Sequence, residues 1–348
     1  MKNLVLTVDY ELFFGRDPGT VENCMIRPTR RLAEVVKEFG CKMTIFWDIM
    51  HFYRLKELEV EVNELRFDRQ IIEKQIRWLV SEGHDVQMSI YPHWLDATWK
   101  NNRWNFSYNR FSLHRLWDEA DADNVQTILG CITKGKALME EICQLEDSNY
   151  KVRAFRAGGY RVEPFDRIAE ALYANNIIVD SSAAFGMKSR TTISPFDFTK
   201  LPKYMQYRFD DTLLRHNPEG RFWEFTKETI RIPLFIRFLF YFWRNFFYTG
   251  KGRFGDGKKL GFTRKEQSGH LWSKIGARYF RLTPEEMDPI RWKYLHSKAR
   301  SNALVVLHSK NMSPFTIQML HQSLVNGEFR FISLLERLKV LKVYDDLQ

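Results

Sequence analysis

Short apolar runs alternate with longer segments whose apolar positions recur at helical spacing. The first run, residues 4–8, is continuously apolar, which is typical of a strand buried on both faces of a sheet. Repeated alternation of strands and helices favours a parallel sheet. The predicted strands cover residues 4–8, 43–47, 85–90, 152–155, 177–179, 229–232, 303–307 and 329–332, and the predicted helices cover residues 30–39, 70–80, 125–145, 164–173 and 316–325.

This rhythm predicts an α/β fold, a distorted (β/α)7-type barrel in which residues 1–348 form a single domain. The alternation stops between the fifth and the last strands, so we expect an insertion at about residues 183–300. No internal repeat or low-complexity linker interrupts the chain elsewhere.

The insertion carries a basic aromatic segment, residues 232–259. The chain has a net charge of +10, and residues 221–265 hold eleven Lys and Arg against three acids, so we expect an anionic partner there. The apolar part is too short to span a bilayer. The segment predicts a helix after Pro233 that carries one polar stripe. A flexible basic loop with glycines at 250, 252, 255 and 257 is predicted to follow this helix. The stripe comprises Arg237, Tyr241, Arg244, Tyr248 and Lys251.

Two interpretations of this segment stay open. In one it is a buried helix whose arginines reach outward. In the other it contacts a membrane surface or forms a lid, and a glycan carried on a lipid phosphate would then suit it.

Nothing in the sequence resembles a nucleic-acid-binding motif, so we expect no nucleic acid as partner. The early first strand leaves no room for a signal peptide, and the four cysteines have no metal or CxxC spacing; we expect a cytoplasmic protein, or one peripheral to the membrane.

Ionisable and polar residues follow most of the predicted strands. Because parallel strands of a barrel end at the same mouth, we expect these side chains to gather there. They are Asp9 and Glu11 after the first strand, Asp48 and His51 after the second, His93 and Trp94 after the third, Arg156 to Tyr160 after the fourth, Asp180 to Ser182 after the fifth, and His308 to Lys310 near the end of the chain.

Taken together, these residues resemble the polysaccharide deacetylase family, carbohydrate esterase family 4. The resemblance covers the chain to about Ser182 and returns near His308, and the order of the motifs also matches. The motifs are Thr7-Val8-Asp9-Tyr10-Glu11, Gly83-His84-Asp85-Val86-Gln87 with Pro92-His93-Trp94, Phe155-Arg156-Ala157-Gly158-Gly159-Tyr160, Val179-Asp180-Ser181-Ser182 and Leu307-His308-Ser309-Lys310.

The resemblance implies removal of acetyl groups from an N-acetylated sugar or glycan. In the family a divalent metal polarises the amide carbonyl and activates water, and zinc is the metal that we expect. The implied roles are Asp9 as general base, His308 as general acid and Arg156 as the charge that pairs with Asp9. Glu11 and His93 are the implied metal ligands. The candidate substrate-binding residues are Trp94, Gly158, Gly159, Tyr160 and Asp180, with the glycine–tyrosine backbone as an oxyanion donor. A packing role in the interior stays open for Trp94, Tyr160 and His93.

One family ligand is replaced. Four residues before His93, where the family has its other ligand histidine, this chain has Ser89, and serine is not a usual ligand for such an ion. Three interpretations stay open. The enzyme uses a rebuilt metal site, it hydrolyses without metal through Asp9 and His308, or it is a degenerate member that binds a glycan or assists a partner.

Overall fold

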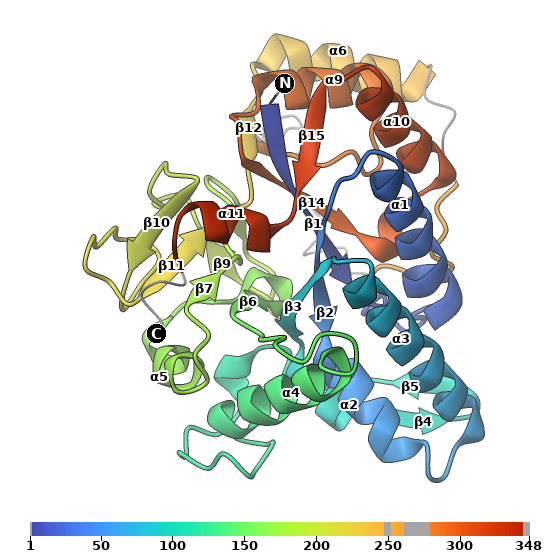
Figure 1. The fold of residues 1–348 in the computed structure, drawn as a ribbon, viewed down its shortest axis with the longest axis vertical. Coiled ribbons are helices and arrows are strands. Elements are labelled where there is room, and N and C mark those ends of the chain that lie inside the picture. The colour runs from blue at the N-terminus through green and yellow to red at the C-terminus, as the bar shows by residue number, and fades with distance from the viewer. Residues whose placement is uncertain (1, 247–251, 261–278, 344–348) are drawn as a thin grey trace.

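A computed structural model describes residues 2–246, 252–260 and 279–343 of the chain (Figure 1). Within them, nine strands form one curved sheet in the order β10-β11-β7-β6-β3-β2-β1-β14, with β15 beside the first half of β1. These strands are β1 (Lys2–Tyr10), β2 (Thr44–Asp48), β3 (Asp85–Ile90), β6 (Ala154–Ala157), β7 (Val179–Asp180), β10 (Gln206–Phe209), β11 (Phe222–Phe225), β14 (Ala303–His308) and β15 (Phe329–Ile332).

The pairs in this sheet are parallel except for β10 with β11. The strands β1, β2, β3 and β6 are buried along nearly their whole length, although β3 alternates polar and apolar residues and β6 carries Arg156. The predicted fold class, an α/β fold with a distorted barrel, is confirmed.

A short stretch at residues 226–228, which follows β11, connects the residues after β7 to the edge strand β14. The Lys227 amide donates to the Ala183 carbonyl at 2.9 Å, and the Glu228 amide donates to the Leu304 carbonyl at 3.1 Å. Lys227 thereby forms parallel bridges with both Ala184, after β7, and Leu304, in β14. The polar side chains at the strand ends therefore share an almost closed interior.

Helices cover the outside of the sheet (Figure 1). They are α1 (Arg27–Glu38), α2 (Ile49–Leu58), α3 (Asn63–Ser81), α4 (Ile128–Cys143), α5 (Asp166–Ala174), α6 (Leu234–Phe246), α9 (Pro289–Lys298), α10 (Pro314–Val325) and α11 (Leu334–Val340). The helix α1 has a strongly one-sided apolar pattern and buries Leu32, Ala33 and Val36. All four cysteines are buried and free.

The predicted sixth strand, residues 229–232, is not part of the large sheet. It forms β12 (Thr229–Arg231), which pairs only with β13 (Tyr279–Arg281). The place beside β7 belongs to β11, a strand of four residues that was not predicted and that buries the polar Glu224. Two further hairpins, β4 (Thr98–Lys100) with β5 (Arg103–Asn105) and β8 (Lys188–Ser189) with β9 (Phe196–Asp197), lie in loops.

The helix predicted after Pro233 is α6. The Phe240 ring packs on Tyr294 of α9 at 5.5 Å between centroids, whereas Phe235 is 70% exposed. The interpretation as a buried helix therefore fails for most of the described side chains: Leu234, Phe238, Leu239, Phe242 and Trp243 are exposed as well. Tyr248 and Lys251 of the predicted stripe, and Gly250, lie outside the described residues. Among the described residues, no helix has both the length and the apolar character needed to cross a bilayer.

Candidate active site at the mouth of the barrel

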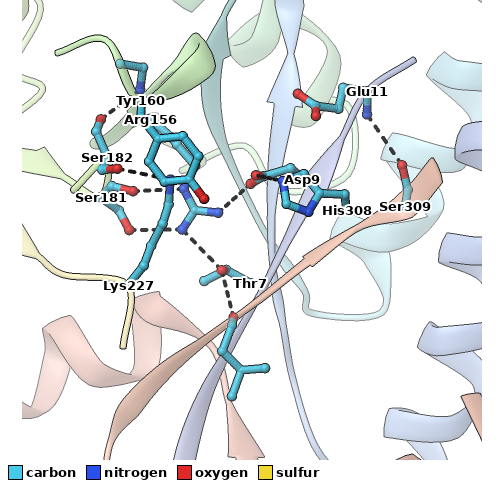
Figure 2. A network of polar contacts seen from close by, with 12 residues as sticks. Thr7, Asp9, Glu11, Arg156, Tyr160, Ser181, Ser182, Lys227, His308 and Ser309 are labelled. Carbon is cyan, nitrogen blue, oxygen red and sulfur yellow. Dashed lines mark hydrogen bonds and ion pairs between the residues drawn. The ribbon is translucent and has the colours of Figure 1, made fainter. Parts of the chain in front are cut away.

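The carboxylate of Asp9 and the imidazole of His308 lie side by side at the mouth of the barrel (Figure 2). Parallel pairing of β1 with β14 puts the two residues in direct register. The Nε2 atom of His308 is 3.4 Å from Oδ2 of Asp9, and both side chains are largely buried. The predicted base and the predicted acid therefore share one site.

Arg156 reaches across the interior of the barrel to this pair. It lies on β6, three strands from β1, and its guanidinium forms an ion pair with Asp9. It also donates to the Thr7 hydroxyl at 3.1 Å and to the carbonyl and hydroxyl of Ser181, each at 2.9 Å (Figure 2). The guanidinium lies 3.8 Å from the centre of the Phe46 ring. This fully used fork fixes the orientation of the Asp9 carboxylate.

The charge of Asp9 depends on these neighbours. Burial by itself would raise the pKa of Asp9, but the positive charges of Arg156, His308 and Lys227 oppose it and lower the pKa to about 2. The carboxylate is therefore ionised at neutral pH. The same low pKa makes it a weak base, so proton abstraction by Asp9 needs help from an acid on the substrate side.

Glu285, which the sequence did not single out, holds the other face of the imidazole. Its two carboxylate oxygens are 3.1 and 3.2 Å from Nδ1 of His308, and it also accepts from the His308 amide and from Nδ2 of Asn311 at 3.3 Å. Burial would raise the pKa of Glu285, but the contacts with His308 lower it. Glu285 lies in an irregular part of the insertion, where no strand end or motif marked it.

We expect Glu285→Gln to lower the turnover number of the proposed reaction about 10- to 100-fold and to change KM little. The neutral amide can still contact Nδ1, but it does not stabilise positive charge on the imidazole. Steady-state kinetics measures the turnover number and KM separately, and Glu219→Gln, at an exposed position, is the control. Glu285→Asp should restore part of the loss; equal turnover in the wild type and Glu285→Gln would remove Glu285 from the site.

Lys227 is a second residue that the sequence analysis missed, since it counted only as part of the basic excess. Its side chain is buried, its Nζ atom donates to the Ser182 carbonyl at 3.1 Å, and it lies 3.9 Å from the centre of the Tyr160 ring (Figure 2). Burial, followed by the charge of Arg156, lowers the pKa of Lys227 to about 7.

This pKa predicts a pH-dependent stability. Between the folded value near 7 and the ordinary value of 10.5, the unfolded chain holds the Lys227 proton and the folded chain releases it. The free energy of unfolding of the wild type should therefore rise with pH across this window, relative to Lys227→Met, by on the order of 1 kcal/mol per pH unit. Urea unfolding of both proteins from pH 6 to pH 10 measures the difference. A difference that does not change with pH would contradict the low pKa.

A pocket of about 360 Å³ opens beside the catalytic pair. Its lining combines aromatic rings and Ile193 with ionisable side chains. The lining residues include Glu11, Phe13, Phe14, Tyr91, Phe111, Gly159, Ile193, Phe196, Lys259, Arg281, His308 and Lys310. None of the described residues that line it belongs to α6, so the described part of that helix is not a lid over this pocket.

Two glycines of the glycine-rich stretch behind α6 are closely packed. A Cβ atom on Gly255 would lie 2.3 Å from the Lys310 carbonyl oxygen, and one on Gly257 would lie 2.5 Å from Pro18. The Phe254 amide also donates to the Met312 carbonyl at 2.8 Å. These close approaches require glycine and bring Lys259 to the pocket wall. A Cβ atom on Gly252, by contrast, would meet nothing within 4 Å, and the flexibility of the loop stays a prediction.

Three potential metal ligands come together at the mouth, and they differ from the predicted pair. In the described part of the chain, Asp9, Glu11 and His308 place one ligand atom each within 4.8 Å of one another. Each carboxylate already has a cation, however. Asp9 pairs with Arg156, and Oε1 of Glu11 lies 2.8 Å from Nζ of Lys310. With these pairs in place, the set does not fit a divalent ion, because its negative charge is already neutralised.

His93 does not join Glu11 in this group, which corrects the predicted ligand pair. The imidazole is fully buried among aromatic rings, with the centroid of Phe111 at 5.1 Å and that of Phe106 at 5.3 Å. Neither ring nitrogen has a hydrogen-bond partner within the described residues. Burial lowers the pKa of His93 to about 3, so the ring is a neutral member of the core. Ser89, at the family's other ligand position, is buried in β3 beside Arg156.

Two predicted substrate-binding residues are also structural. Trp94 is fully buried, and its Nε1 atom donates to Asp48 at 2.7 Å, so it is not available to stack on a sugar. The Asp180 carboxylate is buried and accepts from the Ser182 hydroxyl at 2.6 Å and from the Ser182 amide at 2.9 Å. Asp180 therefore shapes the turn after β7 and does not face the pocket.

The glycine–tyrosine motif does lie at the pocket. Gly158 and Gly159 form a tight turn after β6, and Gly159 has a φ of +61° and lines the pocket. The Tyr160 hydroxyl accepts from Arg281 at 2.6 Å, and its ring stacks on Phe196 at 5.0 Å. Tyr160 therefore positions two residues of the pocket wall. The role of the backbone as an oxyanion donor stays a prediction.

No protein-family model and no curated protein matches the chain. Among solved structures, it is similar to a putative polysaccharide deacetylase from Mycobacterium smegmatis, at 11% identity over 99% of this chain and 91% of that one, with a TM-score of 0.44. It is also similar to a family 4 acetyl xylan esterase from Clostridium thermocellum, at 11% identity over 97% and 91%, with a TM-score of 0.36.

A third solved structure is a 4-alpha-glucanotransferase from Thermococcus litoralis, at 11% identity over 97% of this chain and 40% of that chain, with a TM-score of 0.48. The first two proteins carry names from the family that the motifs resemble. Likenesses at these TM-scores say nothing about chemistry, which here depends on the geometry of the site.

Proposed function

We propose that the chain is a polysaccharide deacetylase-like hydrolase that removes acetyl groups from an N-acetylated sugar or glycan. One observation carries the proposal. An ionised carboxylate held by an arginine lies 3.4 Å from an imidazole that a second carboxylate orients, at a pocket partly lined by aromatic rings. Amide hydrolysis needs such a base and such an acid within reach of one bond. The motif order, which resembles the deacetylase family, supports the same reaction.

The reaction begins with a water molecule held by Asp9. Its carboxylate takes a proton as the water oxygen attacks the acetamide carbonyl carbon, which gives a tetrahedral intermediate. The carbon–nitrogen bond then breaks while Nε2 of the protonated His308 gives its proton to the nitrogen. The products are a free amine on the sugar and acetic acid, which ionises. The proton on Asp9 returns to His308 across the 3.4 Å gap, so both groups are restored.

The assay that tests the proposal measures acetate released from N-acetylhexosamine oligomers by the full chain. The Asp9→Asn variant is the matched negative control. Equal, low release from both proteins would overturn the proposed activity.

A glycan-binding protein without turnover is the second candidate. The ion pair of Glu11 with Lys310 favours this candidate. While the pair is formed, Glu11 is not available as a ligand for the metal that the family uses. The aromatic rings of the pocket lining suit binding of a sugar face equally well. Retention on an N-acetylglucosamine oligomer without acetate release would identify this case.

Contact with a membrane surface, a lipid-linked substrate and a cytoplasmic or membrane-peripheral location stay predictions. The exposed apolar side chains of α6 are compatible with a surface contact. They do not contribute to the described lining of the pocket.

A further inference from the structure

Lys310 lines the pocket and pairs with Glu11, the predicted carboxylate ligand of the metal. It lies two residues after His308, in the short turn Ser309–Asn311 that follows β14, and its side chain is 7% exposed. Its Nζ atom is 2.8 Å from Oε1 of Glu11 and 2.7 Å from the Leu12 carbonyl oxygen. The Phe14 ring centre lies 3.8 Å from the same nitrogen. A buried ammonium with an acid, a carbonyl and a ring around it is a built site rather than a surface ion pair.

The charges around the pocket are balanced without a metal ion. Among the described residues near the pocket, Asp9 faces Arg156 and Glu11 faces Lys310, while Glu285 lies against His308 and interacts with Arg281, and Lys227 lies behind. The buried Asp48 lies close to Glu11 and accepts from the Trp94 ring nitrogen; burial, followed by the charge of Glu11, raises its pKa, which favours the neutral form. A divalent ion between Asp9, Glu11 and His308 would add two positive charges beside these cations. Repulsion at such short range in a buried site opposes its binding.

We propose that the Lys310 ammonium takes the place of the divalent cation in this site. It pairs with the Glu11 carboxylate and supplies a fixed positive charge in the pocket that His308 also lines. An oxygen that gains negative charge in that pocket would be stabilised by the ammonium. This last step depends on the proposed deacetylase function, whereas the exclusion of a metal ion does not.

The test measures the binding of Co²⁺ to the full chain, by calorimetry and by the visible absorption of bound cobalt. The wild type should bind no stoichiometric Co²⁺ at micromolar concentrations. In Lys310→Met, the carboxylate of Glu11 becomes available, so the affinity for one Co²⁺ should rise about 100-fold or more. The exposed Lys258→Met is the matched control for the loss of one charge, and it should behave as the wild type does.

Adding His308→Asn to Lys310→Met should remove the gained binding, because only two candidate ligands remain. If Lys310→Met does not fold, Lys310→Gln replaces it, since its amide can still donate to the Leu12 carbonyl. Tight binding of one Co²⁺ by the wild type would overturn the proposal, and so would equal affinity of wild type and folded variant. Because the readout is binding, a protein that releases no acetate would overturn the proposed function alone.

Discussion

Replacing Asp9 with asparagine is expected to lower acetate release from N-acetylhexosamine oligomers by about 10³-fold. The asparagine amide does not take a proton from water, and it does not return one to His308 across the 3.4 Å gap. Its Oδ1 atom can still accept from Arg156, so the barrel should remain folded, with some loss of stability because a buried guanidinium loses its counter-charge. The acetate assay and circular dichroism together measure these two effects.

The matched control is Asp123→Asn, which neutralises an exposed carboxylate paired with Lys134. It should keep the activity of the wild type, since surface pairs contribute little and Asp123 is not part of the pocket. If Asp9→Asn keeps at least a fifth of the wild-type turnover, Asp9 is not the base, and the proposed reaction loses its main support.

Replacing Arg156 with methionine should give the largest change in stability. The side chain is 2% exposed, and its removal leaves the Asp9 carboxylate buried and the Thr7 and Ser181 oxygens without this donor. Loss of one partner of a buried ion pair costs about 3–5 kcal/mol in the free energy of unfolding. The nearby Lys227 compensates only in part, because its own charged form is disfavoured by burial. Urea unfolding at pH 7 measures the loss.

Arg167→Met is the matched control, because Arg167 pairs with Asp118 on the surface and both side chains are exposed. Its loss should change the free energy of unfolding by about 1 kcal/mol or less. The double variant Arg156→Met with Asp9→Asn should lose less unfolding free energy than the sum of the losses in the two single variants, since neither charge of the pair remains. A loss below about 1 kcal/mol for Arg156→Met would show that this pair does not hold the mouth of the barrel together.

Some strands were located by the sequence to the residue. The predicted strand at residues 85–90 coincides with β3, and the one at residues 329–332 coincides with β15; both have apolar residues at every second position, which is typical of a strand. The strand β11 was not predicted. It is only four residues long, and it contains Glu224, whose pKa is raised by burial and by Asp180 and which accepts from the Ala183 amide. Buried polar residues of this kind depend on partners that lie elsewhere in the chain.

The site divides in the same way. The sequence alone determined Asp9, Arg156 and His308, because each belongs to a motif at the end of a strand and parallel strands end at one mouth. It could not determine whether His93 would face the pocket or the core, since both are consistent with a histidine after a strand. The surrounding rings decided this, and they left His93 neutral and fully buried.

Only the tertiary structure decided which charges meet. Glu285 reaches His308 from an irregular part of the insertion, Lys227 enters where residues 226–228 connect the residues after β7 to β14, and Lys310 turns back onto Glu11. These contacts join residues that are far apart along the chain. The local pattern of apolar and polar residues does not show which distant residues come into contact. The sequence therefore determined the barrel and the two groups that face each other at its mouth. The pairing of charges across the interior, on which the metal question depends, follows from the packing of the whole chain.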